Sequence, residues 1–250
     1  TADWRLSRVV TGEAIDEGIV SRSLEAVEAC VSDVDRIRAH ESEGMRTLIG
    51  GLIESGDCMR EWGGSRPGSG SEHLFSHFWE ARAHESGREA PLHGENVALA
   101  SMVMAGLSER LAEMGPAGLE RRIRSAEPPD PEEVRRRARK AFGRAADELL
   151  ENHPLSGMTS ERFSALREAA AAGAGAIIEI ARAVPPAARI WALIERAGGP
   201  TRPADVGLTT EDVHDALSGA HFIRDRFGLL IFRDLFLPGA SDDIVEKVFA

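Results

Sequence analysis

The sequence has few cysteines, fewer basic than acidic residues and no long apolar run, and each shortage excludes a class of protein. Cys30 and Cys58 are the only thiols in 250 residues, so a disulfide framework is excluded. Both lie on apolar helical patterns, as expected of small core side chains. No apolar run approaches the roughly 20 residues needed to span a membrane. Because Thr-Ala-Asp-Trp-Arg-Leu is no signal segment, a cytoplasmic protein without membrane insertion is expected.

Positive charge is also scarce. The chain has 30 basic residues against 41 acidic ones, a net charge of -11. A protein that binds nucleic acid by neutralising phosphates needs the opposite balance, so no nucleic-acid partner is expected. The chain also lacks an alternating β-α pattern and a glycine-rich phosphate turn between a strand and a helix. No cofactor-binding residue is therefore predicted within it.

What the sequence does contain is helical periodicity, with apolar residues three to five positions apart. Residues 227–237 are dense enough in apolar side chains for a strand, but no partner strand is present, so a buried helix is expected there. The fold class is all-α, a multi-helix bundle forming a single domain over residues 1–250. The expected helices cover residues 13–40, 45–62, 71–85, 94–113, 131–151, 160–182, 186–197 and 210–226.

Three histidines are candidates for a site. His73, His77, Glu80 and His84 lie along one side of the third of these helices, because residues three and four apart are neighbours on a helix. His93 begins the next helix. If the two helices pack side by side, one histidine from each could bind the same divalent metal ion. Such a site would leave a coordination position open, as a catalytic metal requires.

A solvated helix face explains the same spacing, since two histidines four apart are common on exposed helices. The pattern is not the metalloprotease motif His-Glu-x-x-His, because no glutamate follows the first histidine. His84, near the helix end, is expected to face solvent. Spacing alone leaves both interpretations open.

A resemblance to a known family favours the metal site. The stretch SRPGSGSEHLFSHFWE at residues 65–80, followed by Leu-His-Gly-Glu-x-Val at residues 92–97, resembles the sn-glycerol-1-phosphate dehydrogenase family. That family shares a superfamily with iron-containing alcohol dehydrogenases and 3-dehydroquinate synthases. Residues 2–6, 199–207 and 221–227 resemble other parts of its helical C-terminal domain, so the similarity covers essentially the whole chain.

The resemblance implies a role for individual residues. His73 and His93 match the two metal-ligand histidines of the family, and His77 matches a histidine that contacts substrate or relays a proton. Arg66 corresponds to a polar or basic residue near the substrate's phosphate, although a surface arginine would explain it equally well. The implied metal is zinc first, with nickel or iron as alternatives.

The resemblance also implies a missing part. In the family, an N-terminal α/β domain binds NAD(P), and an aspartate before the Ala-Asp-Trp-Arg-Leu stretch is the third metal ligand. Asp3 aligns with that stretch and not with the ligand. The expectation is a helical metal-binding domain that needs a separate or missing NAD(P)-binding domain. A homo-oligomer is also expected.

The implied activity is reversible hydride transfer between dihydroxyacetone phosphate, or a similar small phosphorylated substrate, and NAD(P)H. His77 is the predicted catalytic residue, and it binds substrate together with Arg66. Two alternatives remain open: a dehydroquinate synthase-like sugar-phosphate cyclase or lyase, and a non-catalytic helical partner of a separate cofactor domain.

Overall fold

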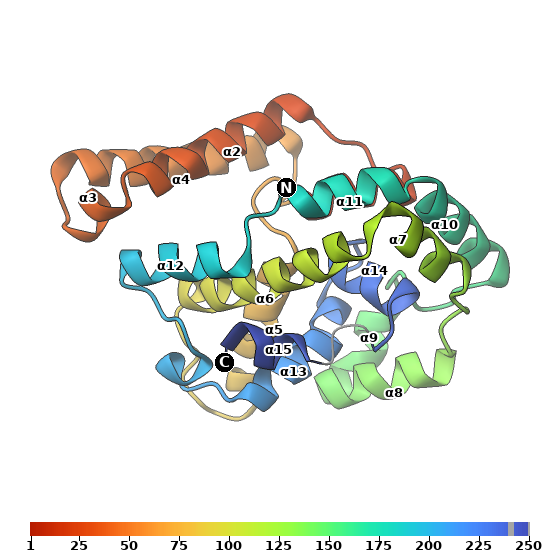
Figure 1. Cartoon of the computed structure of the whole chain (residues 1–250). Coiled ribbons are helices and arrows are strands. Elements are labelled where there is room, and N and C mark those ends of the chain that lie inside the picture. Colours follow the sequence, from red (N-terminus) through yellow and green to blue (C-terminus); the bar gives the residue numbers. More distant parts are fainter. Residues whose placement is uncertain (240–242, 250) are drawn as a thin grey trace.

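The computed structural model describes residues 1–239 and 243–249, and within these ranges the chain contains helices and no strand, which confirms the all-α fold (Figure 1). The first helices are α1 (Ala2–Thr11), α2 (Glu17–Ser32), α3 (Val34–Arg38), α4 (Ser42–Trp62), α5 (Ser71–Glu85) and α6 (His93–Glu113). The middle of the chain forms α7 (Gly115–Arg124), α8 (Pro131–Phe142), α9 (Ala146–Leu150), α10 (Ser160–Ala172) and α11 (Ala174–Ala183). The last are α12 (Ala187–Ala197), α13 (Thr210–Gly219), α14 (Leu229–Phe236) and α15 (Ile244–Phe249), with short 3-10 turns η1 (Gly143–Ala145), η2 (Pro203–Val206) and η3 (Ala220–Ile223).

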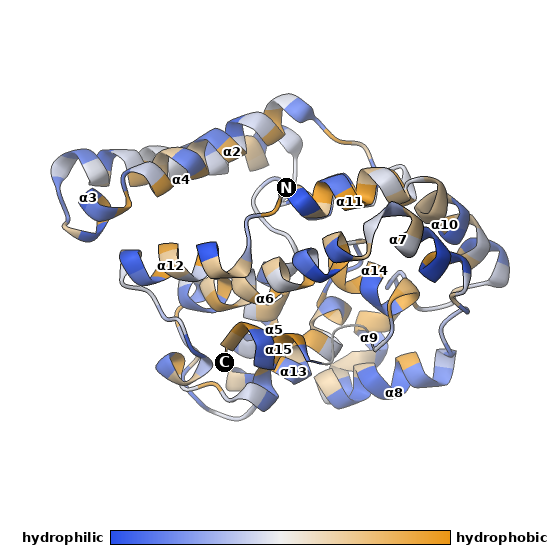
Figure 2. Cartoon of the chain, viewed as in Figure 1, coloured by the Kyte–Doolittle hydropathy of each residue, from blue (hydrophilic) through white to orange (hydrophobic). Residues whose placement is uncertain are grey.

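Helix α6 lies at the centre of the main body, and α5, α11, α12 and α15 all pack against it. Its side chains are buried along most of its length because it is surrounded in this way. Hydrophobic residues are prominent on α11 and α14, whereas α8 is mostly hydrophilic on its visible side (Figure 2). The main core runs continuously through these helices and includes Phe75, Leu99 and Phe232.

Helices α2, α3 and α4 form a separate arm that extends from the main body (Figure 1). At its base a second, small core joins Trp4 to Ile19, Val20 and Cys58. The Trp4 indole donates a 2.8 Å hydrogen bond to the carbonyl oxygen of Ala14, which fixes the entry into the arm. At the far end, α3 contacts α12.

Several expected helices are interrupted in the structure. The helix expected over 13–40 begins only at Glu17 and breaks at Asp33, whose carboxylate accepts a 2.6 Å hydrogen bond from Thr47. The helix expected over 131–151 ends at Gly143, which has a φ of 50°. Those expected over 160–182 and 210–226 break at Gly173 and after Gly219. Helix α7 is an addition that the sequence pattern did not predict.

Other expectations are confirmed. Helix α4 ends at Gly63, in the left-handed region at φ 78°, and residues 227–237 contain helix α14 and no strand. Thr209 and Asp212 form the N-terminal capping box of α13. Cys58 is fully buried, whereas Cys30 is only partly buried. In the described residues, no helix combines the length and apolar character that a membrane span requires.

Candidate metal centre

The start of helix α5 is fixed by a carboxylate from helix α1. Asp3 Oδ2 accepts hydrogen bonds from the backbone nitrogen of Ser71 at 2.7 Å and from its hydroxyl group at 2.5 Å. The other oxygen, Oδ1, accepts from the backbone nitrogen of Leu229 at 2.9 Å. One side chain therefore binds free backbone donors at the N-termini of α5 and α14 together. This position holds the turn that carries His73.

The chain folds back between α5 and α6, which brings His93 beside the middle of α5. The hydroxyl group of Ser76 lies 3.4 Å from the carbonyl oxygen of His93. Since Ser76 lies nine residues before Glu85, the last residue of α5, the start of α6 lies beside a point about 2.5 turns before the end of α5. Residues 86–92 make this return possible.

The three histidines of interest lie next to one another. The ring centroid of His93 is 5.3 Å from that of His73 and 5.4 Å from that of His77. His93 therefore lies within reach of both α5 histidines. His84 is exposed at the end of the helix, as expected.

Glu80 connects this group. Its Oε1 atom lies 2.7 Å from His93 Nδ1 and accepts a 2.8 Å hydrogen bond from the hydroxyl group of Ser76. Its Oε2 atom lies 3.2 Å from His77 Nδ1. His73 has a different partner, because its Nδ1 atom lies 2.8 Å from Glu72 Oε1.

Both carboxylates are held in the ionised form. Partial burial acts to raise the pKa of Glu80, but hydrogen bonds from His93, Ser76 and His77 outweigh it and keep that pKa below its usual value. Burial likewise opposes ionisation of Glu72, yet hydrogen bonds from His73 and from the backbone of Gly70 lower its pKa to about 2. At neutral pH, therefore, two negative charges face the three imidazoles.

The donor set fits a divalent transition metal. Ligand atoms of His77, Glu80 and His93 all lie within 4.8 Å of one another, and His73 is not part of this group. The geometry of the ligand atoms thus groups His77 and Glu80 with His93 as potential ligands, whereas the family resemblance favours His73. Imidazole nitrogens with a carboxylate are the usual ligands of zinc and accept nickel and iron as well. The structure thus brings together His73, His77 and His93, all predicted from the sequence, with Glu80, which the sequence placed on the same side of the helix, and it adds Ser76. The four-residue spacing of Ser76 and Glu80 on α5 was an available signal, but spacing does not assign a role.

Arg66 lies in the core and not on the surface. Only 5% of its side chain is exposed. It donates to both carboxylate oxygens of Glu13, at 3.0 and 2.6 Å, and to the carbonyl oxygen of Phe227 at 2.7 Å. The structure therefore gives Arg66 a packing role between the loop that joins α1 to α2 and the loop that precedes α14. Its predicted contact with substrate phosphate stays a prediction.

Helices α5 and α6 pack together and bring histidines and a carboxylate to one place. This is the ligand arrangement of a metalloenzyme centre in an all-α protein. Comparison with known proteins narrows the class. The chain is 27% identical over 228 residues to glycerol-1-phosphate dehydrogenase [NAD(P)+] of Halalkalibacterium halodurans, covering 91% of this chain and 47% of that protein. Enzymes of the same name from Pyrobaculum islandicum and Bacillus licheniformis are 42% identical over 104 residues and 34% identical over 126 residues.

These two matches cover 41% and 50% of this chain, and 30% and 31% of the relatives. The resemblance to the glycerol-1-phosphate dehydrogenase family is thereby confirmed. No family model matches the chain. The chain spans about half the length, or less, of the curated relatives that it matches.

Proposed function

We propose that this chain is the metal-binding helical part of a metal- and NAD(P)-dependent oxidoreductase that interconverts dihydroxyacetone phosphate and glycerol 1-phosphate. The observation that carries the proposal is the convergence of His73, His77 and His93 in a chain whose relatives bear that enzyme's name. Without the histidine cluster, similarity over half of a relative would leave the function open.

In this proposal His73 and His93 hold the ion. A bound divalent metal supplies Lewis-acid polarisation of the substrate's carbonyl group. His77 positions the substrate or relays a proton to the alcohol oxygen, a task that suits an imidazole at neutral pH. Its side chain is 30% exposed, so substrate can reach it.

Positive charge near the loop at residues 65–70 supports a phosphate subsite. Arg226 donates a 3.3 Å hydrogen bond to Ser69. Burial, followed by the nearby charges of Arg66 and Arg224, lowers the pKa of Arg226, while the carboxylates of Asp3 and Glu13 oppose the lowering. Arg66 is already paired with Glu13, so Arg226 and Arg224 are the cations left to bind a phosphate group. In a chain of net charge -11, local cations of this kind are what an anionic substrate requires.

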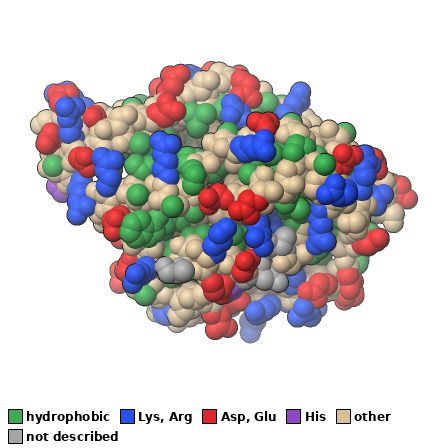
Figure 3. Space-filling model, viewed as in Figure 1, with side chains coloured by type: hydrophobic (Ala, Val, Ile, Leu, Met, Phe, Trp, Pro, Cys, Tyr) green, Lys and Arg blue, Asp and Glu red, His purple; other side chains and the backbone are tan. Residues whose placement is uncertain are grey.

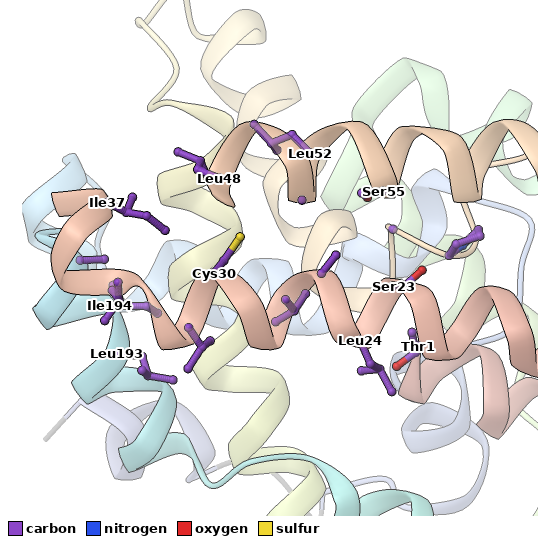
Figure 4. A pocket seen from close by; sticks show the side chains of 18 of the residues that line it. Thr1, Ser23, Leu24, Cys30, Ile37, Leu48, Leu52, Ser55, Leu193 and Ile194 are labelled. Carbon is purple, nitrogen blue, oxygen red and sulfur yellow. The ribbon is translucent and has the colours of Figure 1, made fainter. Parts of the chain in front are cut away.

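The NAD(P) site is proposed to lie in a domain outside residues 1–250, on the same or on a separate polypeptide, that covers an apolar groove. This groove has a volume of about 570 Å³ between the arm and α12, and Leu48 and Leu52 of α4 line it together with Leu193 and Ile194 of α12 (Figure 4). Green hydrophobic side chains gather in the same region of the surface (Figure 3). Glu72 lines the groove while its carboxylate holds His73, so the groove adjoins the candidate centre.

The relatives favour an NAD(P)-binding domain as the occupant of the groove. The Halalkalibacterium halodurans relative has more residues outside the segment that matches this chain than within it. A second copy of this chain in the groove, giving the expected homo-oligomer, is the competing outcome. The cytoplasmic location stays a prediction.

Metal analysis tests the core of the proposal. The purified chain is expected to carry one divalent ion, and His73→Ala and His93→Ala are expected to lose it, whereas His84→Ala on the same helix keeps it. A metal-free wild type at neutral pH would refute the assignment.

Turnover tests the partner. NADH or NADPH oxidation with dihydroxyacetone phosphate is measured with and without a polypeptide equivalent to the part of the Halalkalibacterium halodurans relative outside the match. Activity is expected only with both chains. Activity of this chain alone would contradict the need for a partner, and no activity with both would favour a non-catalytic role.

A further inference from the structure

Each of the two proposed ligand histidines has one ring nitrogen at hydrogen-bond distance from a carboxylate. His73 Nδ1 lies 2.8 Å from Glu72 Oε1, and His93 Nδ1 lies 2.7 Å from Glu80 Oε1. An ionised carboxylate only accepts hydrogen bonds, so the proton must be on Nδ1 in both rings. In a neutral imidazole this leaves the lone pair on Nε2.

Glu80 also contacts His77, so it has three donors around two oxygens. Its Oε2 atom lies 3.2 Å from His77 Nδ1, while the Ser76 hydroxyl group donates to Oε1 at 2.8 Å. Ser76 is fully buried, which fixes this donor in place. The carboxylate is therefore held between the two helices by hydrogen bonds from both.

The distances separate a hydrogen-bonded carboxylate from a metal-bound one. Two ligands at 2.0–2.1 Å from a tetrahedral zinc ion lie about 3.3 Å apart. The 2.7 Å separation of His93 Nδ1 and Glu80 Oε1 is shorter than that and is typical of a charge-assisted hydrogen bond. Glu80 thus has the geometry of a group that orients a ligand.

We propose that Glu72 and Glu80 are positioning residues that hold His73 and His93 as Nδ1–H tautomers, so that both bind metal through Nε2. This inference rests on the metal-binding function proposed above. It assigns Glu80 to the support of the centre, although Glu80 lies close enough to be a ligand itself. Removing such a support lowers metal affinity about 10- to 100-fold.

The tautomers are measured by long-range ¹H–¹⁵N NMR of the histidine rings, first in metal-free protein and then during zinc titration. We expect Nδ1–H signals for His73 and His93 in the metal-free protein. These protons are expected to persist on zinc binding, while the Nε2 resonances shift. Loss of the Nδ1–H signals, with zinc bound through Nδ1, would overturn the inference and leave the metal site intact.

Zinc affinity, measured by competition with a chromogenic chelator, supplies the second readout. Glu80→Gln and Glu72→Gln are expected to bind one zinc ion per chain about 10- to 100-fold more weakly. Glu85→Gln, at an exposed position of the same helix, is the matched control and keeps wild-type affinity. Ser76→Ala, which removes a donor to Glu80 without changing charge, is expected to give a smaller loss.

The outcomes distinguish this inference from the function on which it rests. Unchanged affinity in Glu80→Gln, with a folded protein by circular dichroism, would remove Glu80 from the centre. A cobalt-loaded Glu80→Gln protein whose visible absorption bands change would identify Glu80 as a ligand instead. Failure of the wild type to bind zinc would overturn the proposed function and the inference together.

Discussion

Arg66 illustrates how burial of one charged residue depends on its partners. Its side chain is 5% exposed, and Glu13 and the Phe227 carbonyl group accept the hydrogen bonds of its guanidinium group. A sequence pattern cannot reveal this, because Glu13 lies 53 positions away in the chain. Arginine in a Gly/Ser/Pro-rich loop is consistent with a surface or ligand-binding residue, and only the folded chain shows the pairing.

Arg66→Ala is expected to lower the free energy of unfolding by about 3 kcal/mol, because it leaves the carboxylate of Glu13 without its partner. Because the side chain of Glu13 is 30% exposed, the expected loss of stability is at the lower end of the range observed when one partner of a buried ion pair is removed. Arg5→Ala, which breaks an exposed pair with Glu17, is expected to cost less than about 1 kcal/mol. Urea unfolding curves of both variants decide the matter, and equal losses would contradict the structural role of Arg66.

His153 makes stability depend on pH. Burial lowers its pKa to about 4, with a smaller opposing contribution from the hydrogen bond to the carbonyl oxygen of His221. Between about pH 4 and pH 6.5 the unfolded chain binds a proton at this histidine and the folded chain does not. The free energy of unfolding therefore falls as the pH drops through this window. At about 1.4 kcal/mol per pH unit, the contribution is about 3 kcal/mol.

His153→Gln is expected to flatten this dependence. Its unfolding free energy should change by about 3 kcal/mol less than that of the wild type between pH 7 and pH 4. His221 remains and has the same sign, because burial lowers its pKa as well. Chemical denaturation across the pH range measures the slopes, with the exposed His84→Gln as control. Parallel wild-type and His153→Gln profiles would show that His153 is not buried in neutral form.

At the scale of the element, helix α4 contains glycines with opposite surroundings. A Cβ atom added at Gly44 would lie 2.5 Å from the carbonyl carbon of Arg36 and 2.6 Å from the backbone nitrogen of Ile37. Both are backbone atoms of the α3 segment, which cannot move aside cheaply. At Gly50 the added atom would meet nothing within 4 Å. Gly44 is thus required for the close packing of α4 on α3.

Gly44→Ala is expected to destabilise the protein by about 1–3 kcal/mol through overpacking. Gly50→Ala is expected to stabilise it by about 0.5–1 kcal/mol, since alanine loses less backbone entropy than glycine in a helix. Thermal unfolding of the two variants should move the midpoint in opposite directions. A shift of the same sign in both would show that the α3–α4 contact does not constrain the arm.

Helix identity was predictable from the sequence, whereas helix breaks were not. Periodicity and end signals located α4, α5 and α6, because glycine, proline and serine punctuate those segments. Apolar spacing continues across the breaks at Asp33 and Gly173, so each helix pair was expected as one helix. At Gly173 the requirement for glycine is tertiary: an added Cβ would lie 2.3 Å from Val9 Cγ1 of α1, a helix far away in the sequence.

The candidate site was also predictable only in part, because sequence spacing shows which residues share a helix but not how the helices meet. Helical spacing placed His73 and His77 on one side, and the Leu-His-Gly motif marked His93. The hydrogen bonds of Glu80 to His77 and His93 depend on where the chain returns after α5. That return is set by the loop at residues 86–92, whose conformation has no periodic signal.

At the scale of the whole molecule, the arm leaves an unusual amount of apolar surface exposed. Val27 is 59% exposed and Leu52 is 65% exposed, and both line the groove. Ile49 and Ile53 extend the apolar surface along α4, at 52% and 61% exposure. Contiguous apolar surface of this kind marks an interaction site in proteins that remain soluble. A partner seated in the groove would therefore cover Val27 and Leu52.

The native chain is accordingly expected to bind the dye 8-anilinonaphthalene-1-sulfonate in its groove. A Val27→Asn/Leu52→Asn double variant should lose most of the dye fluorescence, because polar side chains would replace two apolar walls. Leu92→Asn is the matched control, since Leu92 is 72% exposed but does not line the groove. Addition of the NAD(P)-binding polypeptide should displace the dye from the wild type. Equal dye fluorescence in all three proteins would show that the dye binds elsewhere, and the groove would no longer be the docking surface. If raising the concentration of this chain alone displaces the dye, a second copy of the chain is the occupant of the groove.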